Sequence, residues 1–167
     1  GKLLHGKHYL AGNLGGHMSI NLHGDICNCG NLGCVESEAS TWALQRRILR
    51  SSDYKNSKLF DELEINFNLV FGHAREGDEL AIKIRENSLK AWSLAIINLI
   101  HAYDPERVVI GGGIMKSKEL IIPYVQSMIE KDTWIRDHVV ELVPAEQVEY
   151  AGILGMYHLI GSLKNKQ

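Results

Sequence analysis

Three cysteines and one histidine in a short segment constrain this chain more than any other feature of its sequence. Nine residues separate His17 from Cys27, and Cys29 and Cys34 follow, so that every cysteine of the protein lies within eighteen positions. Zinc is bound in proteins by four nitrogen or sulfur ligands at about 2.0 to 2.3 Å. The segment therefore predicts a tetrahedral Cys3His zinc site. Because four protein ligands leave no position for a catalytic water, we expect the ion to be structural.

The turns of so short a metal-binding segment need residues that reverse the chain at little steric cost. Gly24, Gly30 and Gly33 are placed for this role, because glycine adopts positive φ readily. The cysteines could instead be small buried hydrophobic residues, but that interpretation does not explain why they cluster. A disulfide framework is also disfavoured, because the number of cysteines is odd and Cys27 and Cys29 are too close for an easy disulfide with each other.

The composition excludes several classes of protein. With 167 residues, of which 45% are hydrophobic and 23% charged, the chain matches one soluble globular domain. The net charge is −2 and no basic cluster is denser than Arg46-Arg47, so we expect this chain to bind no nucleic acid. The longest apolar run, residues 91–102, is too short and too polar to span a membrane. Reduced cysteines and the lack of a signal peptide predict a cytoplasmic protein.

Hydrophobic periodicity predicts an α/β fold with a largely parallel sheet. The expected strands lie around Leu3 and Leu4 and over residues 18–22, 107–110 and 139–143. The expected helices cover residues 36–50, 79–103, 117–131 and 151–162, with a short helix over 58–63 and a helical turn over 71–78. Asp78 is predicted to cap the helix 79–103. The chain starts Gly1-Lys2-Leu3, without an initiator methionine, so we expect it to be a piece of a longer protein.

Three consecutive glycines, Gly111, Gly112 and Gly113, connect the strand 107–110 to the helix 117–131. Bare backbone in such a turn lets a base, ribose or phosphate approach closely. The sequence matches neither of the usual glycine-rich phosphate motifs, and a glycine turn of this kind also occurs as a plain connection. Nucleotide contact and simple architecture are therefore both open interpretations.

The stretch G-H-x9-C-x-C-G-x2-G-C-x-E, residues 16–36, resembles the signature of the ROK family of bacterial sugar kinases and sugar-responsive repressors. Supporting similarities are A-R-E-G-D at 74–78, D-P-E-R-V-V-I-G-G-G at 104–113 and A-G-I-L-G at 151–155. The resemblance implies that residues 1–167 are the C-terminal lobe of an actin-like ATPase (ribonuclease H-like) fold with a structural zinc loop. The N-terminal lobe would be absent from this chain, and sugar and ATP with Mg²⁺ would meet in the cleft between the lobes.

The resemblance also implies roles for individual residues. His17 would bind zinc and touch the sugar, because one imidazole nitrogen can bind an ion while the other donates to a hydroxyl. Glu36 would hold sugar hydroxyls. The glycines 111–113 would lie on the adenosine side of the cleft.

This sequence departs from the family pattern at two points. Family kinases carry a sugar-binding glutamate in E-[I/L]-G-H, whereas this chain reads N-L-G-G-H. An ungapped alignment puts Leu14 at that position, and an alignment with one inserted glycine puts Asn13 there, so Asn13 is a candidate sugar ligand. The phosphate-binding D-x-G-x-T motif and the catalytic Asn-Asp pair lie upstream in the family. Since this chain has no Asn-Asp, we expect no catalytic residue in it and no turnover by the chain alone.

Two functions follow from the resemblance. The first is ATP-dependent phosphorylation of a hexose or N-acetylhexosamine by the intact protein, in which this lobe contacts sugar and nucleotide. The alternative is the sugar-sensing domain of a ROK-family transcriptional repressor, and a sugar-binding protein that has lost both roles is a third possibility. We also expect the protein to form a homodimer.

Overall fold

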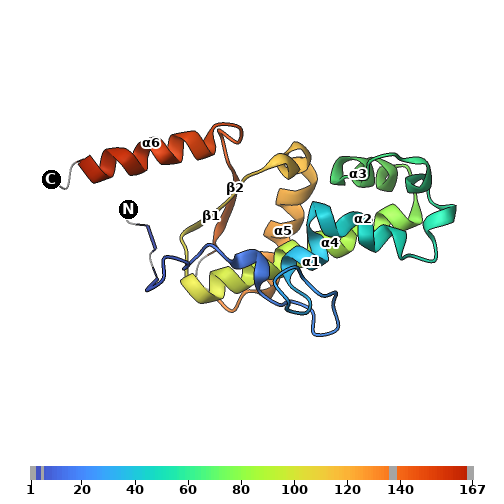
Figure 1. The fold of residues 1–167 in the computed structure, drawn as a ribbon, viewed down its shortest axis with the longest axis horizontal. Coiled ribbons are helices and arrows are strands. Elements are labelled where there is room, and N and C mark those ends of the chain that lie inside the picture. The colour runs from blue at the N-terminus through green and yellow to red at the C-terminus, as the bar shows by residue number, and fades with distance from the viewer. Residues whose placement is uncertain (1–2, 5, 136–138, 165–167) are drawn as a thin grey trace.

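The computed structural model describes residues 3–4, 6–135 and 139–164 (Figure 1). The α-helices of this part are α1 (Val35–Ala39), α2 (Thr41–Leu49), α3 (Phe67–Arg75), α4 (Glu79–Tyr103), α5 (Lys118–Asp132) and α6 (Ala151–Lys164). Its 3₁₀ helices are η1 (Gly15–His17), η2 (Tyr54–Asn56), η3 (Lys58–Asp61) and η4 (Gly113–Ser117), and its strands are β1 (Arg107–Ile110) and β2 (Glu141–Pro144). The predicted α/β class is confirmed.

α4 is the long helix against which α1, α3 and α5 pack (Figure 1). It begins after Asp78, whose Oδ1 accepts a hydrogen bond of 2.8 Å from the Ala81 amide. It ends at Asp104, which adopts the left-handed conformation with φ of 46°. Both limits agree with the predicted helix 79–103. Its buried side chains join those of the neighbouring elements in one hydrophobic core that includes Ile48, Leu59, Val70, Ile97, Ile100, Ile121, Val125 and Leu142.

The two described strands pair in parallel, with Arg107 opposite Glu141 and Ile110 opposite Pro144. Parallel strands need a crossover connection, and α5 supplies it. α5 also contacts β2 directly, because the Gln126 side chain accepts a hydrogen bond of 3.1 Å from the Leu142 amide. The predicted parallel pairing is therefore confirmed, and the glycine turn follows the carboxyl end of β1.

The predicted helix 36–50 is two helices. The chain breaks at Ser40, which has extended φ and ψ of −93° and 165°. The Ser40 side chain accepts a hydrogen bond of 3.3 Å from the Ala43 amide and so caps α2. A serine that caps the helix after it competes with continuation of the helix before it, which explains the error.

The predicted strand over residues 18–22 is also wrong. This segment forms an isolated antiparallel bridge between Ser19 and Cys34, and His17 lies at the end of η1 rather than at the start of a strand. The alternation of apolar and polar side chains predicts a strand here. The segment beside it is the cysteine loop, which pairs with it only at the bridge between Ser19 and Cys34 and forms no longer β-ladder. Leu3 and Leu4 likewise adopt no strand, and both side chains are exposed.

The region before α4 is more helical than predicted. α3 starts at Phe67, because the Asn66 side chain accepts a hydrogen bond of 3.1 Å from the Leu69 amide and caps the helix. The expected helix over 58–63 is the 3₁₀ helix η3. The helices predicted over 117–131 and 151–162 and the strand over 139–143 are present as α5, α6 and β2, with bounds that differ by at most two residues.

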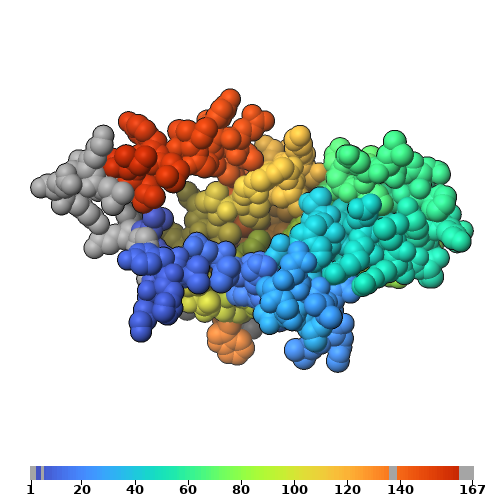
Figure 2. Space-filling model, in the orientation of Figure 1, coloured from blue at the N-terminus to red at the C-terminus, as the bar shows by residue number. Residues whose placement is uncertain are grey.

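On the face that Figure 2 shows, α6 runs along the upper left edge, above residues 6–14, and α1 and α2 lie farther to the right. α6 exposes apolar side chains, among them Ile153 and Tyr157. Among the described residues, no helix is both long and apolar enough to cross a membrane.

Candidate functional site

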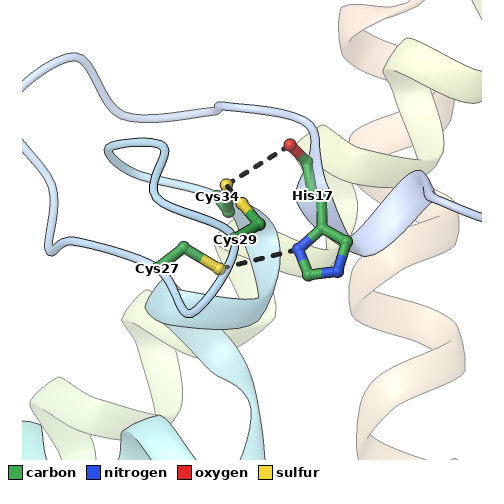
Figure 3. A group of neighbouring side chains, drawn as sticks. All are labelled: His17, Cys27, Cys29 and Cys34. Atoms are coloured by element: carbon green, nitrogen blue, oxygen red, sulfur yellow. Dashed lines mark hydrogen bonds between the residues drawn. The ribbon is translucent and has the colours of Figure 1, made fainter.

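The four side chains singled out by the sequence point toward one another (Figure 3). The ligand atoms of His17, Cys27, Cys29 and Cys34 all lie within 4.8 Å of one another. Cys27 and Cys34 are buried, His17 is half-buried and Cys29 is exposed. The prediction that these residues form one cluster is confirmed, and they are close enough to bind a metal.

The spacing of the donor atoms fits one tetrahedral ion. Ligands at typical zinc distances place nitrogen and sulfur about 3.6 Å apart and two sulfurs about 3.8 Å apart along tetrahedron edges. Nδ1 of His17 lies 3.6 Å from Sγ of Cys27, and the Sγ atoms of Cys29 and Cys34 lie 3.6 Å apart. Nδ1 is therefore the imidazole nitrogen that faces the metal position, and Nε2 is left for another partner.

The cysteine loop is shaped by backbone hydrogen bonds and two glycines. The Cys27 amide donates to the Asn31 carbonyl over 2.8 Å and closes a tight hairpin, in which Gly30 has φ of 90°. Gly33 has φ of 62°, and a Cβ at this position would collide with the Asn21 carbonyl oxygen. The predicted turn role is thus confirmed at Gly30 and Gly33, where the conformation itself requires glycine.

The three thiols share a crowded site. Burial, together with the neighbouring thiols of Cys29 and Cys27, raises the pKa of Cys34 to about 12. At Cys29 a backbone hydrogen bond at Asn31 lowers the pKa of the thiol. A cation among the sulfurs would replace the proton on Cys34, so a metal in this cluster would be bound with release of protons.

Glu38 anchors the loop to the helices. Its carboxylate accepts hydrogen bonds from the Asp25 amide at 3.0 Å, from the Asn21 side chain at 3.2 Å and from Arg47 at 2.6 Å. Burial opposes ionisation of Glu38, but these hydrogen bonds outweigh it and hold the pKa of its carboxyl below the ordinary value. Gly24 lies against this carboxylate, where a Cβ would collide with it.

Glu36 lies beside the cluster and connects it to α2. Its Oε2 is 3.2 Å from Nδ1 of His17, and its Oε1 accepts a hydrogen bond of 3.0 Å from Nε1 of Trp42. Gly16 packs its backbone near the Glu36 side chain, so η1 brings the imidazole to the carboxylate. The structure therefore places the His17 imidazole beside the Glu36 carboxylate. Asn13 is exposed, and its amide donates to the Tyr9 carbonyl within its own turn.

The glycine turn borders a hollow between α1, α3 and α4. This hollow has a volume of about 600 Å³, and its lining includes Ser40, Asn66, Phe67, Trp92, Gly113 and Lys116. Phe67 and Trp92 meet edge to face with ring centroids 5.0 Å apart. Gly112 has φ of 95°, and Gly111 packs against Ala145 after β2. Of the three predicted glycines, Gly113 lines the hollow directly.

The comparison with protein families decides what kind of chain this is. The model of the ROK family matches residues 1–162. The chain belongs to the ROK family. The earlier resemblance rested on the cysteine loop, and that loop lies inside the matched range.

ROK relatives of two kinds are similar to this chain. It is 32% identical to a glucokinase of Thermotoga maritima over 96% of this chain and 52% of the relative. It is 26% identical to the Escherichia coli DNA-binding transcriptional dual regulator NagC over 89% of this chain and 37% of the relative. The chain thus spans about half the length, or less, of these curated relatives.

A solved structure supports the fold. The ROK hexokinase of Thermus thermophilus superposes with a TM-score of 0.72 at 26% identity, over 93% of this chain and 49% of that chain. The expected relation to ROK sugar kinases of the actin-like ATPase fold is therefore confirmed.

Sequence reasoning missed several residues around the site. No pattern in the sequence indicates that Glu38 and Arg47 form an ion pair. The pair joins α1 to α2, and these are separate helices only because the chain breaks at Ser40. Trp42 lies within the predicted helix 36–50, but nothing in the sequence indicates that its indole contacts Glu36. Phe67 and Trp92 reach the hollow from distant parts of the chain, so that only their aromatic character could have been noted.

Proposed function

We propose that residues 1–167 form the C-terminal, sugar- and nucleotide-contacting lobe of a ROK-type sugar kinase. In the intact protein this enzyme would use ATP to phosphorylate a hexose or N-acetylhexosamine. The observation that supports this most is the pairing of His17 and Glu36 at the edge of the cysteine cluster, in a chain 32% identical to a glucokinase. No residue of this lobe is proposed to act as the catalytic base.

Zinc is the proposed metal, held by His17, Cys27, Cys29 and Cys34. Three sulfurs and one imidazole nitrogen are the donor set that zinc prefers, and their spacing fits a tetrahedron. The ion would fix the loop rather than react, because the four ligands fill its coordination sphere. Since Nδ1 of His17 faces the metal position, Nε2 can donate a hydrogen bond to a sugar hydroxyl.

The sugar is proposed to bind at Glu36 and His17, with Asn13 as a further contact. A carboxylate accepts hydrogen bonds from hydroxyls strongly because it is charged. Asn13 lies two residues before η1, which ends at His17, and its exposed amide has both a donor and an acceptor. It lacks the charge of the glutamate that the family pattern has near this position.

The nucleotide is proposed to bind at the glycine turn. The hollow beside Gly113 has aromatic walls at Phe67 and Trp92, a lysine at Lys116 and room for a nucleobase. Gly112 and Gly113 have open space where a side chain would point, so the backbone can approach a ligand. ATP with Mg²⁺ is the proposed cofactor pair of the intact protein.

A second candidate is the sugar-sensing domain of a ROK repressor. The observation that favours it is the neutral pair Asn13 and Leu14 where the kinase pattern has a glutamate, together with 26% identity to the NagC regulator. Such a protein would bind sugar at the same residues without phosphorylating it. The homodimer remains an expectation for either candidate, and the mass of the intact protein in solution tests it.

Sugar binding and phosphorylation by the full-length protein test the proposal. Calorimetry with glucose and with N-acetylglucosamine should show binding that Glu36→Ala weakens by about ten-fold or more, because a hydrogen bond to a charged group is lost. Glu86→Ala, a change at an exposed carboxylate of α4, should leave the affinity unchanged. ATP-dependent product formation identifies the kinase, whereas binding without turnover identifies the repressor-type domain. Unchanged affinity in Glu36→Ala with a lowered melting temperature would refute the sugar site.

A further inference from the structure

The carboxylate of Glu36 lies between two nitrogen atoms. Nδ1 of His17 is 3.2 Å from Oε2, and Nε1 of Trp42 donates to Oε1 over 3.0 Å. These two contacts are not equivalent once a metal is bound. The same Nδ1 faces Sγ of Cys27, and a ring nitrogen that binds a metal has no proton to donate. The indole N–H, which can only donate, keeps its hydrogen bond to Glu36 in either state.

The contact between Trp42 and Glu36 depends on the break at Ser40. In one continuous helix, two residues six positions apart would lie about 120° apart around the axis and would not face each other. Because the chain is extended at Ser40, α2 turns and brings Trp42 back over the first turn of α1. The indole lies outside the hydrophobic core, so its position is not explained by core packing.

Arg46 fixes the other side of the indole. Its guanidinium lies 5.0 Å from the centroid of the Trp42 ring, a cation–π arrangement. The same guanidinium donates to the Ile26 carbonyl at 3.3 and 3.4 Å and pairs with Asp25 at 3.5 Å. Ile26 precedes the metal-ligating Cys27. The indole is therefore held between the carboxylate of Glu36 and, through Arg46, the backbone of the cysteine loop.

We propose that Trp42 is the positioning residue of the sugar site: its indole N–H holds Oε1 of Glu36 and leaves Oε2 for a sugar hydroxyl. This inference rests on the proposed function, because it assigns Glu36 to sugar binding. It adds that Trp42 acts on sugar affinity through Glu36 and independently of metal retention. Arg46 maintains the ring in place by stacking on it.

Trp42→Phe in the full-length protein tests this role, because it removes the N–H and retains a ring beside Arg46. Affinity for glucose or N-acetylglucosamine, measured by calorimetry, should fall about ten-fold, while zinc content and melting temperature stay close to those of the parent. If the protein is a kinase, the KM for sugar should rise and the KM for ATP should not. The control is Trp134→Phe at an exposed tryptophan, which should change neither affinity nor KM.

The double variant Glu36→Ala/Trp42→Phe separates positioning from a general structural effect. If Trp42 acts through Glu36, the double variant should bind sugar as weakly as Glu36→Ala alone. Additive losses, or parental affinity in Trp42→Phe, would overturn the inference while the sugar site at Glu36 stands. If Glu36→Ala itself binds sugar like the parent, or the parent binds neither sugar, the proposed function fails and the inference fails with it.

Discussion

Cys27 is the residue at which a substitution tests the proposed zinc site most directly. It is buried, its Sγ faces Nδ1 of His17, and its backbone amide closes the hairpin whatever its side chain. Cys27→Ser keeps the size of the side chain but replaces a thiolate by a poor zinc ligand. We expect about one zinc per chain in the parent and much less in the variant, measured by elemental analysis.

The stability of the same variant is the second measurement. Structural zinc contributes on the order of 10 kcal/mol of apparent binding free energy in small metal-binding units, so the cysteine loop should unfold at a clearly lower temperature than in the parent. Ser52→Ala at an exposed serine is the control and should change neither quantity. A parent that contains almost no zinc, with Cys27→Ser equally stable, would be incompatible with the proposed metal site.

At the scale of elements, Asp78 joins α4 to the 3₁₀ segment before α3. Its carboxylate accepts from the Ala81 amide at 2.8 Å, from the Ser57 hydroxyl at 2.9 Å and from the Lys58 amide at 2.7 Å. Asp78→Ala removes a helix cap and leaves two further donors without a partner, so it should cost about 2 kcal/mol of the free energy of unfolding. Chemical denaturation measures this cost.

Glu79→Gln is the matched control for Asp78→Ala. It changes the next carboxylate, which is exposed in the first turn of α4 and does not cap the helix. A loss of stability in Glu79→Gln as large as in Asp78→Ala would show that helix charge rather than capping is responsible.

Glu38 should make the attachment of the cysteine loop to the helices dependent on pH. The pKa of its carboxyl is lower in the folded chain than the ordinary value of about 4.3, because the Asp25 amide and Arg47 outweigh the opposing effect of burial. A lowered folded pKa means that the stabilisation is present above about pH 4.3 and is lost as the pH falls through the folded pKa. Glu38→Gln should therefore be less stable than the parent near pH 6.

The difference in stability between parent and Glu38→Gln should shrink as the pH is lowered below about 4.3. Thermal unfolding between pH 3 and pH 6 measures it, with Glu86→Gln as an exposed control. A difference in stability that stays constant over this range would mean that the charge of Glu38 does not stabilise the attachment of the cysteine loop to the helices.

The elements that the sequence predicted correctly are those with strong local signals. α4 has a capping aspartate and a long apolar pattern, β1 has a short apolar run before glycines, and the three cysteines stand close together in the chain. The break at Ser40 was missed because a serine inside an apolar helical pattern has a weak signal. The ion pair of Glu38 with Arg47 and the hydrogen bond between Trp42 and Glu36 both depend on that break. They could not be predicted without it.

At the scale of the whole molecule, the chain has a helical core and a cysteine loop, residues 17–34, that lies outside it. The core contains residues of α2 to α5, η3, η4 and β2, and the buried Cys27 and Cys34 lie outside it. The loop is attached to it through Glu38, Arg46 and Arg47. The apolar side chains exposed along α6, in a chain half the length of its glucokinase relative, agree with the proposal that residues 1–167 are one lobe.

Removal of the proposed zinc should therefore unfold the cysteine loop and leave the hydrophobic core folded. In the parent, the amides of Cys27 and Gly33 donate hydrogen bonds to the Asn31 and Asp25 carbonyls, so we expect both to exchange slowly. After treatment with a zinc chelator, hydrogen exchange at these two amides should become fast, because the ligands that hold the hairpin closed are released. Amides in the second half of α4 should keep their protection, since Ile97 and Ile100 pack in the core. Mass spectrometry of peptides from both regions measures the two rates in one sample. Equal loss of protection in both would mean that loop and core fold as a single cooperative unit, and that the proposed zinc stabilises the whole chain rather than only the cysteine loop.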